Sequence, residues 1–320
     1  MESLSLTVPA PAKLSLFHHV TGQRADGYHA LESLMVLLDF GDSLTLARRD
    51  DGRIVLTHPL PGVPVESDLA YRAAQRLKQH TGTTQGVTIS VDKRIPLGAG
   101  LGGGSSDAAS VLLALNRLWN LELSRAELMG IGLQLGADVP FFIFGSNAHV
   151  AGIGEALRPI TLPRLAYLIG VPPVQVATAD IFAAPRLKRD TPMTGADAFP
   201  IGFGRNDLQA VAAGLHSGIA MAITALDAEQ FGDRARAAHT AARMSGSGSS
   251  VFRIIGRGFP ETVTVGRAAG DSKRDDWKFS QGANHLSPPA RGAGGGLSGG
   301  PGLIMARGLD HHPLREFAAK

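Results

Sequence analysis

The residues with the clearest chemical potential lie in one segment, 96–110, which reads Pro-Leu-Gly-Ala-Gly-Leu-Gly-Gly-Gly-Ser-Ser-Asp-Ala-Ala-Ser. Five of its residues between positions 98 and 104 are glycines. Glycine permits positive φ and has no Cβ, so this loop can present bare backbone N–H groups to a phosphate. The hydroxyls of Ser105 and Ser106 follow, where they could reach a phosphate oxygen or its Mg²⁺. The segment therefore predicts a binding site for a phosphorylated ligand.

The elements on either side of this loop support that prediction. Val87, Ile89 and Val91 alternate with polar residues, as in a strand with one buried face, and apolar residues recur at helical spacing over 111–119. The helix would be capped by Ser105, Ser106 or Asp107 and would add its positive end to the loop. The loop lacks the lysine of a Walker motif and the spacing of a dinucleotide fingerprint. A flexible turn between two elements is the alternative interpretation.

Two charged residues stand in apolar surroundings elsewhere in the chain. Lys13 lies within the apolar segment 11–16, and Asp138 directly precedes the apolar run 139–144. Either residue has an ordinary structural explanation, because a lysine can extend along apolar surface to water and an aspartate can cap a turn or a helix. Local sequence alone leaves a catalytic role open for both.

Two further segments could contact a ligand. Tyr28 and His29 follow a polar turn over 22–27 and could form a flat surface with a hydrogen-bonding edge, or an ordinary half-buried pair. Residues 244–252 form a second loop of small residues that runs into a strand.

The remaining pattern predicts alternating strands and helices. Strands are expected over 4–20, broken by Pro9 and Pro11, and a helix is expected from Ser67 or Asp68 to about His80. Ser124 and Glu127 form a capping box for a further helix. Residues 290–302 are almost of low complexity, and we expect 290–320 to be a disordered extension.

Composition excludes several classes of protein. With 320 residues the chain can form two domains, and the absence of cysteine excludes disulfides, thiolate catalysis and Cys-ligated zinc. The formal net charge is +3, without a Lys/Arg stripe interleaved with aromatics, so no nucleic-acid partner is expected. No membrane span and no secretory leader are evident, which predicts a cytoplasmic protein. The sequence does not determine the oligomeric state, and a monomer or a homodimer is expected.

Three separated segments together resemble the motifs of the GHMP small-molecule kinases. They are Pro11-Ala-Lys13, the loop 96–109 and Met244-Ser-Gly-Ser-Gly248. Other segments are similar to those members of the superfamily that phosphorylate a cytidine-diphosphate-linked methylerythritol in the non-mevalonate route to isoprenoid precursors. These segments are Thr21–His29, Phe40–Asp42, Leu135–Phe141 and Asn206–Leu208, and the resemblance covers residues 5–253.

The resemblance implies an α+β, two-domain GHMP kinase fold. Residues 1–162 would form an N-terminal, ATP-binding domain like the second domain of ribosomal protein S5. Residues 163–289 would form a ferredoxin-like C-terminal domain, followed by the extension 290–320. The implied activity is ATP-dependent phosphorylation of the substrate's 2-hydroxyl. Another GHMP kinase, acting on homoserine, mevalonate or a sugar, and a nucleotide-binding protein without catalysis are the alternatives.

The resemblance also implies roles for individual residues. Asp138 would be the general base, and Lys13 would stand beside it and stabilise negative charge. The cytosine end of the substrate would be held by Tyr28, His29, Thr178 and Phe182, with the base between Tyr28 and Phe182. Gly246, Ser247 and Gly248 would close on the substrate phosphates. The phosphates of ATP would be held by Pro96, Gly98, Gly100, Gly102, Gly103, Gly104, Ser105 and Ser106, with Ser105 near Mg²⁺.

The sequence departs from the family pattern at two of the expected binding residues. Ser15 occupies a position where asparagine is common, which would shorten a hydrogen bond to substrate or route it through water. Asp68 replaces an asparagine expected near the adenine, which would weaken nucleotide binding.

Overall fold

The computed structural model describes residues 4–60, 62–195, 199–229, 240–256 and 302–318. The strands are β1 (Ser5–Gln23), β2 (His29–Arg49), β3 (Ile54–Leu56), β4 (Gly86–Asp92), β5 (Ala148–Gly152), β6 (Ala156–Pro159), β7 (Ala166–Val171), β8 (Arg243–Met244), β9 (Val251–Gly256) and β10 (Gly302–Leu309). The helices are α1 (Leu69–Thr81), α2 (Gly103–Leu118), α3 (Arg125–Leu133), α4 (Val139–Phe144), α5 (Thr178–Ala183), α6 (Gln209–Leu215) and α7 (Ser217–Ala228), with short 3₁₀ helices at Val65–Ser67 and Arg315–Phe317.

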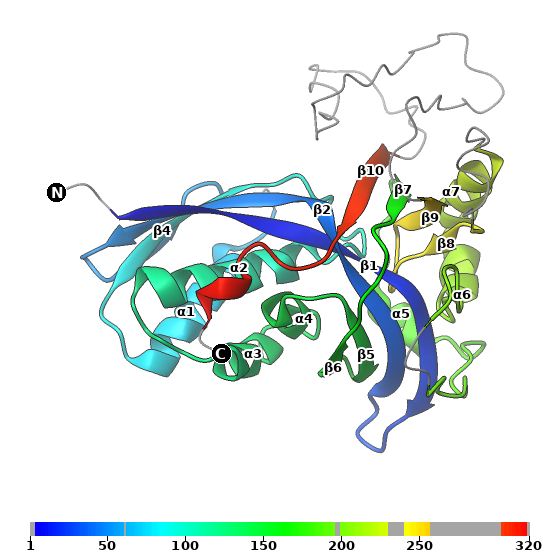
Figure 1. The fold of residues 1–320 in the computed structure, drawn as a ribbon, viewed down its shortest axis with the longest axis horizontal. Coiled ribbons are helices and arrows are strands. Elements are labelled where there is room, and N and C mark those ends of the chain that lie inside the picture. The colour runs from blue at the N-terminus through cyan, green and yellow to red at the C-terminus, as the bar shows by residue number, and fades with distance from the viewer. Residues whose placement is uncertain (1–3, 61, 196–198, 230–239, 257–301, 319–320) are drawn as a thin grey trace, which may run out of the picture.

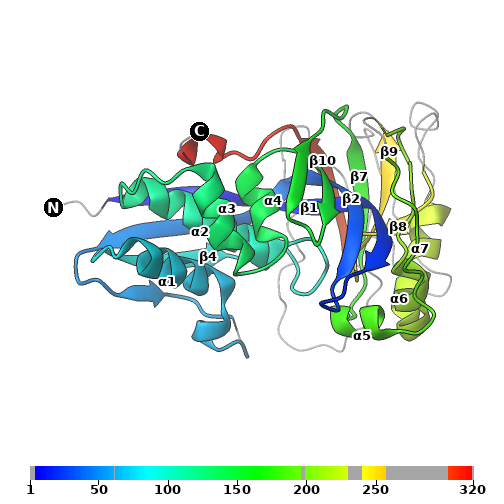
Figure 2. The same ribbon diagram turned by 90° about the horizontal axis from the view of Figure 1, so that it is seen from below.

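The strands form one continuous mixed sheet in the order β3-β4-β2-β10-β7-β9-β8, and β1 and β5 also pair with β2. Helices α1 to α4 lie on one face of the part built from β1, β2 and β4, while α6 and α7 lie beside β7, β8 and β9 (Figures 1 and 2). The architecture is thus α+β, as predicted. The boundary predicted at 162/163 remains a prediction; it lies between the end of β6 and the start of β7.

The long strands β1 and β2 form the centre of the first half of the molecule. The predicted break at Pro9 and Pro11 is wrong, because β1 continues from Ser5 to Gln23. Among the described strands β1 pairs only with β2, so prolines can be accommodated on its unpaired side, and the antiparallel register shifts between Pro11 and Lys13. Opposite, a Cβ on Gly41 would lie 2.3 Å from the carbonyl oxygen of Ala10, so the close approach of the two strands requires glycine here.

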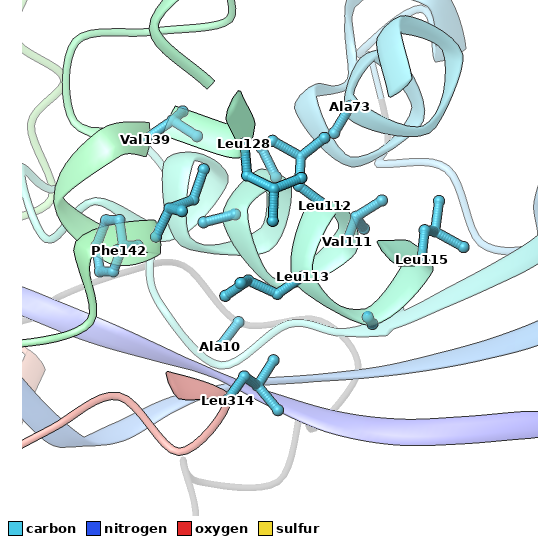
Figure 3. Packing of buried hydrophobic residues seen from close by; sticks show 14 of the residues in the cluster. Ala10, Ala73, Val111, Leu112, Leu113, Leu115, Leu128, Val139, Phe142 and Leu314 are labelled. Atoms are coloured by element: carbon cyan, nitrogen blue, oxygen red, sulfur yellow. The ribbon is translucent and has the colours of Figure 1, made fainter. Parts of the chain in front are cut away.

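Helix α2 is the centre of the largest hydrophobic core. Its residues Val111, Leu112 and Leu115 are fully buried. Figure 3 shows the surrounding side chains, which come from β1 (Ala10), α1 (Ala73), α3 (Leu128) and α4 (Val139, Phe142). Packing of this density fixes the axis of α2, and therefore also the position of its N-terminus.

The end of the chain corrects the prediction of a disordered extension. Strand β10 pairs with β7 over Gly302–Arg307 and with β2 at Gly308 and Leu309, so it joins the two halves of the sheet. Leu314 is then buried in the core around α2, where Figure 3 shows it near Ala10. The prediction is therefore wrong for 302–318, whereas residues 290–301 lie outside the described part of the chain.

Helices α6 and α7 pack against the sheet in the second half of the molecule. Val211, Ala212, Ile219, Ala222 and Leu226 belong to one buried cluster with residues of β7 and β9. Among the described residues, no single helix is long and apolar enough to cross a membrane. Of the described helices, only α6 and α7 taken together are long and apolar enough, and they are bent by 117° relative to each other.

Candidate active site

The first glycine loop, residues 96–104, turns directly into α2. Gly98, Gly100 and Gly102 have φ values of 67°, 73° and 76°. Helix α2 begins at Gly103, and Gly102 is its N-cap without a side-chain hydrogen bond, so the predicted cap at residues 105–107 is wrong. The N–H groups at the start of α2 lack intrahelical partners and point toward the loop, where an anion can bind.

The two serines that follow the glycines have different environments. Ser105 is half-buried in the first turn of α2. Ser106 is fully buried, and its hydroxyl donates to the carbonyl oxygen of Pro11 at 2.7 Å. The side chain of Ser106 therefore ties α2 to β1 and is removed from the loop surface. This corrects the expectation that Ser106 contacts phosphate.

Asp68 caps α1 and also borders the loop. Its Oδ1 accepts hydrogen bonds from the N–H groups of Ala70 at 2.8 Å and Tyr71 at 3.3 Å, which confirms the predicted helix cap. A Cβ on Gly104 would lie 3.3 Å from Cδ1 of Leu69, so the start of α1 lies against the first turn of α2. Asp68 is thus placed beside the first glycine loop.

A buried cluster of three charged residues holds both ends of the first glycine loop. Asp42 accepts from the backbone N–H groups of Arg94 and Ile95 at 2.5 and 2.7 Å. Lys93 donates from Nζ to Asp42 at 2.5 Å and to Asp107 at 2.7 Å. Burial raises the pKa of Asp107 to about 7, and the neighbouring Asp42 adds to the rise against the opposing effect of Lys93. The motif that contains Asp42 was identified from the sequence, but the contacts of Asp42 with Lys93 and with the backbone before the loop were not predicted.

The second glycine loop, residues 244–250, is held by a side chain instead of a helix. The amide nitrogen of Asn206 donates to the carbonyl oxygens of Met244 and Gly246 at 2.8 and 2.7 Å. The two loops meet, because Ser250 N–H donates to the carbonyl of Ala99 at 3.0 Å. A Cβ on Gly100 would lie only 2.5 Å from the carbonyl oxygen of Gly248, so their contact excludes a side chain there.

Lys13 and Asp138 come together where the loops meet. Nζ of Lys13 lies 3.5 Å from Oδ2 of Asp138; the lysine side chain is 4 % exposed and the aspartate 32 % exposed. Nζ also donates to Oγ of Ser15 at 3.2 Å. The backbone N–H of Lys13 donates to the carbonyl of Leu101, and a Cβ on Gly246 would be 3.2 Å from Nζ. A fixed ammonium group thus lies between both loops, next to a carboxylate that solvent and ligands can reach.

The residues expected at the cytosine end form a second group on β2 and α5. The rings of His29 and Phe182 stack with centroids 4.8 Å apart and planes at 27°. Thr178 donates from its hydroxyl to Oγ of Ser247 at 2.9 Å, which connects α5 to the second glycine loop. Tyr28 is 63 % exposed. The ring that stacks on Phe182 is therefore that of His29, while Tyr28 extends into solvent.

Two interactions that hold this region together were missed from the sequence. Nε of Arg189 donates to Nε2 of His29 at 3.0 Å. Asp207 accepts from Val20 N–H at 2.9 Å and from the hydroxyl of Thr191 at 2.6 Å, which holds β1 against the second half of the chain. Arg189 lies in a segment without periodicity, so no sequence signal distinguishes it; Asp207 belongs to a recognised motif that was given no role.

Comparison with known proteins identifies the family. The model of the GHMP kinases N terminal domain matches residues 68–146. Proteins named 4-diphosphocytidyl-2-C-methyl-D-erythritol kinase from Ralstonia pickettii (strain 12J) and Burkholderia mallei (strain SAVP1) are 47% and 46% identical, over 97% of this chain and 96% of theirs. Because so little of the chain is left out, these alignments include most of residues 290–320.

Solved structures agree with this assignment. A crystal structure of 4-(cytidine 5'-diphospho)-2C-methyl-D-erythritol kinase is 35% identical, with a TM-score of 0.66, and the match covers 78% of this chain and 90% of that one. A mevalonate kinase, 13% identical with a TM-score of 0.51, shares the fold. On the identity and coverage of these relatives, the chain belongs to the 4-diphosphocytidyl-2-C-methyl-D-erythritol kinase family of the GHMP kinase superfamily.

Proposed function

We propose that this chain transfers the γ-phosphoryl group of ATP to the 2-hydroxyl of 4-diphosphocytidyl-2-C-methyl-D-erythritol, in the non-mevalonate route to isopentenyl diphosphate. The observation that carries the proposal is the Lys13–Asp138 pair, 3.5 Å apart, at the junction of two glycine loops. The names of the relatives support the choice of substrate.

In the proposed mechanism Asp138 accepts the proton of the attacking hydroxyl. The hydroxyl oxygen then forms a bond to the γ-phosphorus, and the bond from that phosphorus to the β,γ-bridging oxygen breaks, which releases ADP. Lys13 stabilises the negative charge that develops around the transferred group. Phosphoryl transfer requires mainly positioning and charge neutralisation, and a carboxylate within hydrogen-bond reach suffices as base.

The nucleotide phosphates would occupy the first glycine loop and the start of α2. The donors would be backbone N–H groups of the loop and of the first turn of α2, together with the hydroxyl of Ser105. Mg²⁺ bound with ATP would neutralise charge on the β- and γ-phosphates. Mg²⁺ prefers oxygen ligands such as the Ser105 hydroxyl and the phosphate oxygens of ATP. Among the described residues, no group of three His, Cys, Asp or Glu side chains could hold a metal ion.

The substrate would extend from the second glycine loop to the His29–Phe182 pair. Its phosphates would meet Gly246, Ser247 and Gly248, whose loop is joined to Thr178 by a side-chain hydrogen bond. Its cytosine would lie against Phe182 and the edge of His29. The exposed ring of Tyr28 is free to cover the other face of the base.

The two departures from the family pattern acquire specific consequences. The side chain of Ser15 is fully buried and its Oγ accepts a hydrogen bond from Lys13, so Ser15 would hold the ammonium group of Lys13 in place and would not contact the substrate directly, which corrects the expectation of a hydrogen bond to substrate. Asp68 uses Oδ1 to cap α1, and as a carboxylate it offers the adenine no donor, unlike the amide of an asparagine.

A coupled ADP-release assay tests the proposal. The cytidylyl substrate should support turnover, while homoserine, mevalonate and galactose should give no ADP above the rate without acceptor. Turnover with one of those three and none with the cytidylyl substrate would assign the chain to a different GHMP activity. Tight ATP binding without transfer to any acceptor would contradict catalysis altogether.

A further inference from the structure

We infer that Arg189 is a positioning residue that fixes the tautomer of His29, so that the ring offers its Nδ1–H as a hydrogen-bond donor to the bound base. The inference rests on the proposed cytidylyl substrate and adds a determinant of base specificity. Its starting point is the hydrogen bond of 3.0 Å between Nε of Arg189 and Nε2 of His29.

The chemistry of the two side chains decides which atom carries the proton. A guanidinium group has only donors, so Nε2 of His29 must be the acceptor in this hydrogen bond. In a neutral imidazole one nitrogen accepts and the other carries hydrogen, which leaves the proton on Nδ1. Burial lowers the pKa of His29 and the charge of Arg189 lowers it further, which favours the neutral ring that this hydrogen bond requires.

The same guanidinium group also fixes the surroundings of the ring. Its Nη2 donates to the carbonyl oxygens of Phe182 and Ala184 at 2.7 and 3.0 Å, and its Nη1 donates to that of Leu187 at 3.0 Å. Phe182 is the residue on which His29 stacks. One side chain therefore sets the tautomer of His29 and holds the backbone of its stacking partner.

A donor fixed in this way discriminates between pyrimidine bases. Cytosine presents acceptors at N3 and O2, whereas uracil carries a hydrogen at N3. If the Nδ1–H of His29 faces N3 of the base, it can donate a hydrogen bond to cytosine. With uracil the same N–H would face the N3–H donor and stay without an acceptor, which is costly for a buried donor. If the ring could change tautomer freely, this discrimination would weaken. We therefore expect Arg189 to favour cytidylyl over uridylyl ligands.

Nitrogen NMR of the full chain tests the tautomer without any substrate. The signals of His29 are assigned by their loss in His29→Asn. The wild type should show a protonated Nδ1 and an unprotonated Nε2, and Arg189→Ala should shift the ring toward a mixture of tautomers. A protonated Nε2 in the wild type, or an unchanged tautomer in Arg189→Ala, would overturn the inference.

Kinetics with cytidylyl and uridylyl substrates test the consequence. Arg189→Ala should lower kcat/KM for the cytidylyl substrate by roughly tenfold to a hundredfold, while KM for ATP changes by less than about threefold. In the same variant, the ratio of kcat/KM for the cytidylyl substrate to kcat/KM for the uridylyl substrate should decrease. Arg186→Ala is the matched control, because Arg186 lies in the same segment and contacts the Val211 carbonyl at 3.5 Å. Equal losses with both substrates in Arg189→Ala would mean that Arg189 only clamps α5.

A double-mutant cycle separates the two roles further. The side-chain amide of His29→Asn carries a donor that needs no tautomer control. Arg189→Ala should therefore cost much less in the His29→Asn background than in the wild type. If the double variant loses kcat/KM by the product of the two single-variant losses, the two residues act independently, which would contradict the inference. If no cytidylyl substrate is turned over at all, the proposed function fails, but the NMR experiment still decides the role of Arg189.

Discussion

The first glycine loop leads into a long helix, whereas the second leads into a short strand, and the two are held in different ways. The first is followed by α2, whose buried face fixes the direction of its free N–H groups, and its ends are braced by Lys93 between Asp42 and Asp107. The second has no such helix and depends on the amide of Asn206. A glycine loop can thus be held in place either by a packed helix or by one buried side chain.

The difference suits the ligands proposed for each loop. A helix N-terminus adds its dipole to an array of N–H groups, which favours the highly charged phosphates of ATP. The second loop connects through Ser247 to Thr178 and α5, and so to the His29–Phe182 pair. Lys13 lies between the loops and is close to both. The following variants test whether the loops act separately and meet at this lysine.

Lys13→Met should have the largest effect, because it removes the cation shared by both loops and keeps most of the side-chain volume. We expect kcat to fall by roughly 10²- to 10³-fold, the loss typical of removing one group that stabilises charge in the transition state. Steady-state kinetics and circular dichroism of the folded variant check this. A folded variant with wild-type kcat would show that the ammonium group is not used.

Gly100→Ala should disturb both loops at once. The residue has a φ of 73°, and the new Cβ would lie 2.5 Å from the carbonyl oxygen of Gly248. We expect the free energy of unfolding to fall by more than the ~1–2 kcal/mol of the left-handed conformation alone, and KM to rise for both substrates.

Gly98→Ala is the matched control for this variant. Gly98 has a similar φ of 67°, but the nearest atom to its new Cβ is Cγ of Gln175 at 3.8 Å. In urea unfolding, Gly98→Ala should lose only the free energy needed to hold alanine in the left-handed conformation. Equal losses in the two variants would show that the contact between the loops is unimportant.

Asn206→Ala should affect the second loop selectively. It leaves the carbonyl oxygens of Met244 and Gly246 without their amide donor, which costs about 1–3 kcal/mol of unfolding free energy. KM for the phosphate acceptor should rise severalfold more than KM for ATP. If both KM values rise equally, the two loops are not separable as the comparison requires.

Asp207→Asn should change how stability depends on pH. Burial alone would raise the pKa of Asp207, but hydrogen bonds from Thr191, Val20 and Arg205 outweigh it and lower the pKa below 3.8. A carboxyl group whose pKa is lower in the folded state than in the unfolded state stabilises the fold at any pH above its unfolded-state pKa. This stabilisation is lost as the pH falls from the unfolded-state pKa through the folded-state pKa. The variant should therefore be less stable by about 1–3 kcal/mol at neutral pH, and the difference should shrink on acidification.

Urea unfolding over a series of pH values measures this effect. Asp50→Asn is the control, because the Asp50 side chain is 86% exposed and its pairing with Arg48 lies at the surface. It should differ little from the wild type at any pH. A stability difference for Asp207→Asn that is constant with pH would contradict the assignment of a lowered pKa.

The sequence was most informative where structure is local. The strand at 86–92 and the loop that follows it were predicted from alternation and glycine spacing, and the caps at Asp68 and Ser124 from residue type and position. Lys13 and Asp138 each had an ordinary explanation when considered alone. Only the resemblance suggested that they meet, because no local pattern carries a contact between residues so far apart in the chain.

The failures concern features that depend on distant partners. Residues 302–309 form a strand because β2 and β7 lie on either side, and neither partner can be read from that segment. Pro9 and Pro11 remain inside β1 because, among the described strands, β1 pairs only with β2, and the register shifts after Pro11. Serine is a common phosphate ligand, but the hydroxyl of Ser106 donates to the carbonyl oxygen of Pro11 in β1.

The most direct test of the central claim is single-turnover transfer of phosphate from labelled ATP to the cytidylyl substrate by the wild type and Asp138→Asn, with ATP binding measured on the same samples. The variant should bind ATP as the wild type does, because the first glycine loop is untouched, and should transfer phosphate at least roughly 10²-fold more slowly. Transfer at the wild-type rate by folded Asp138→Asn would contradict the account.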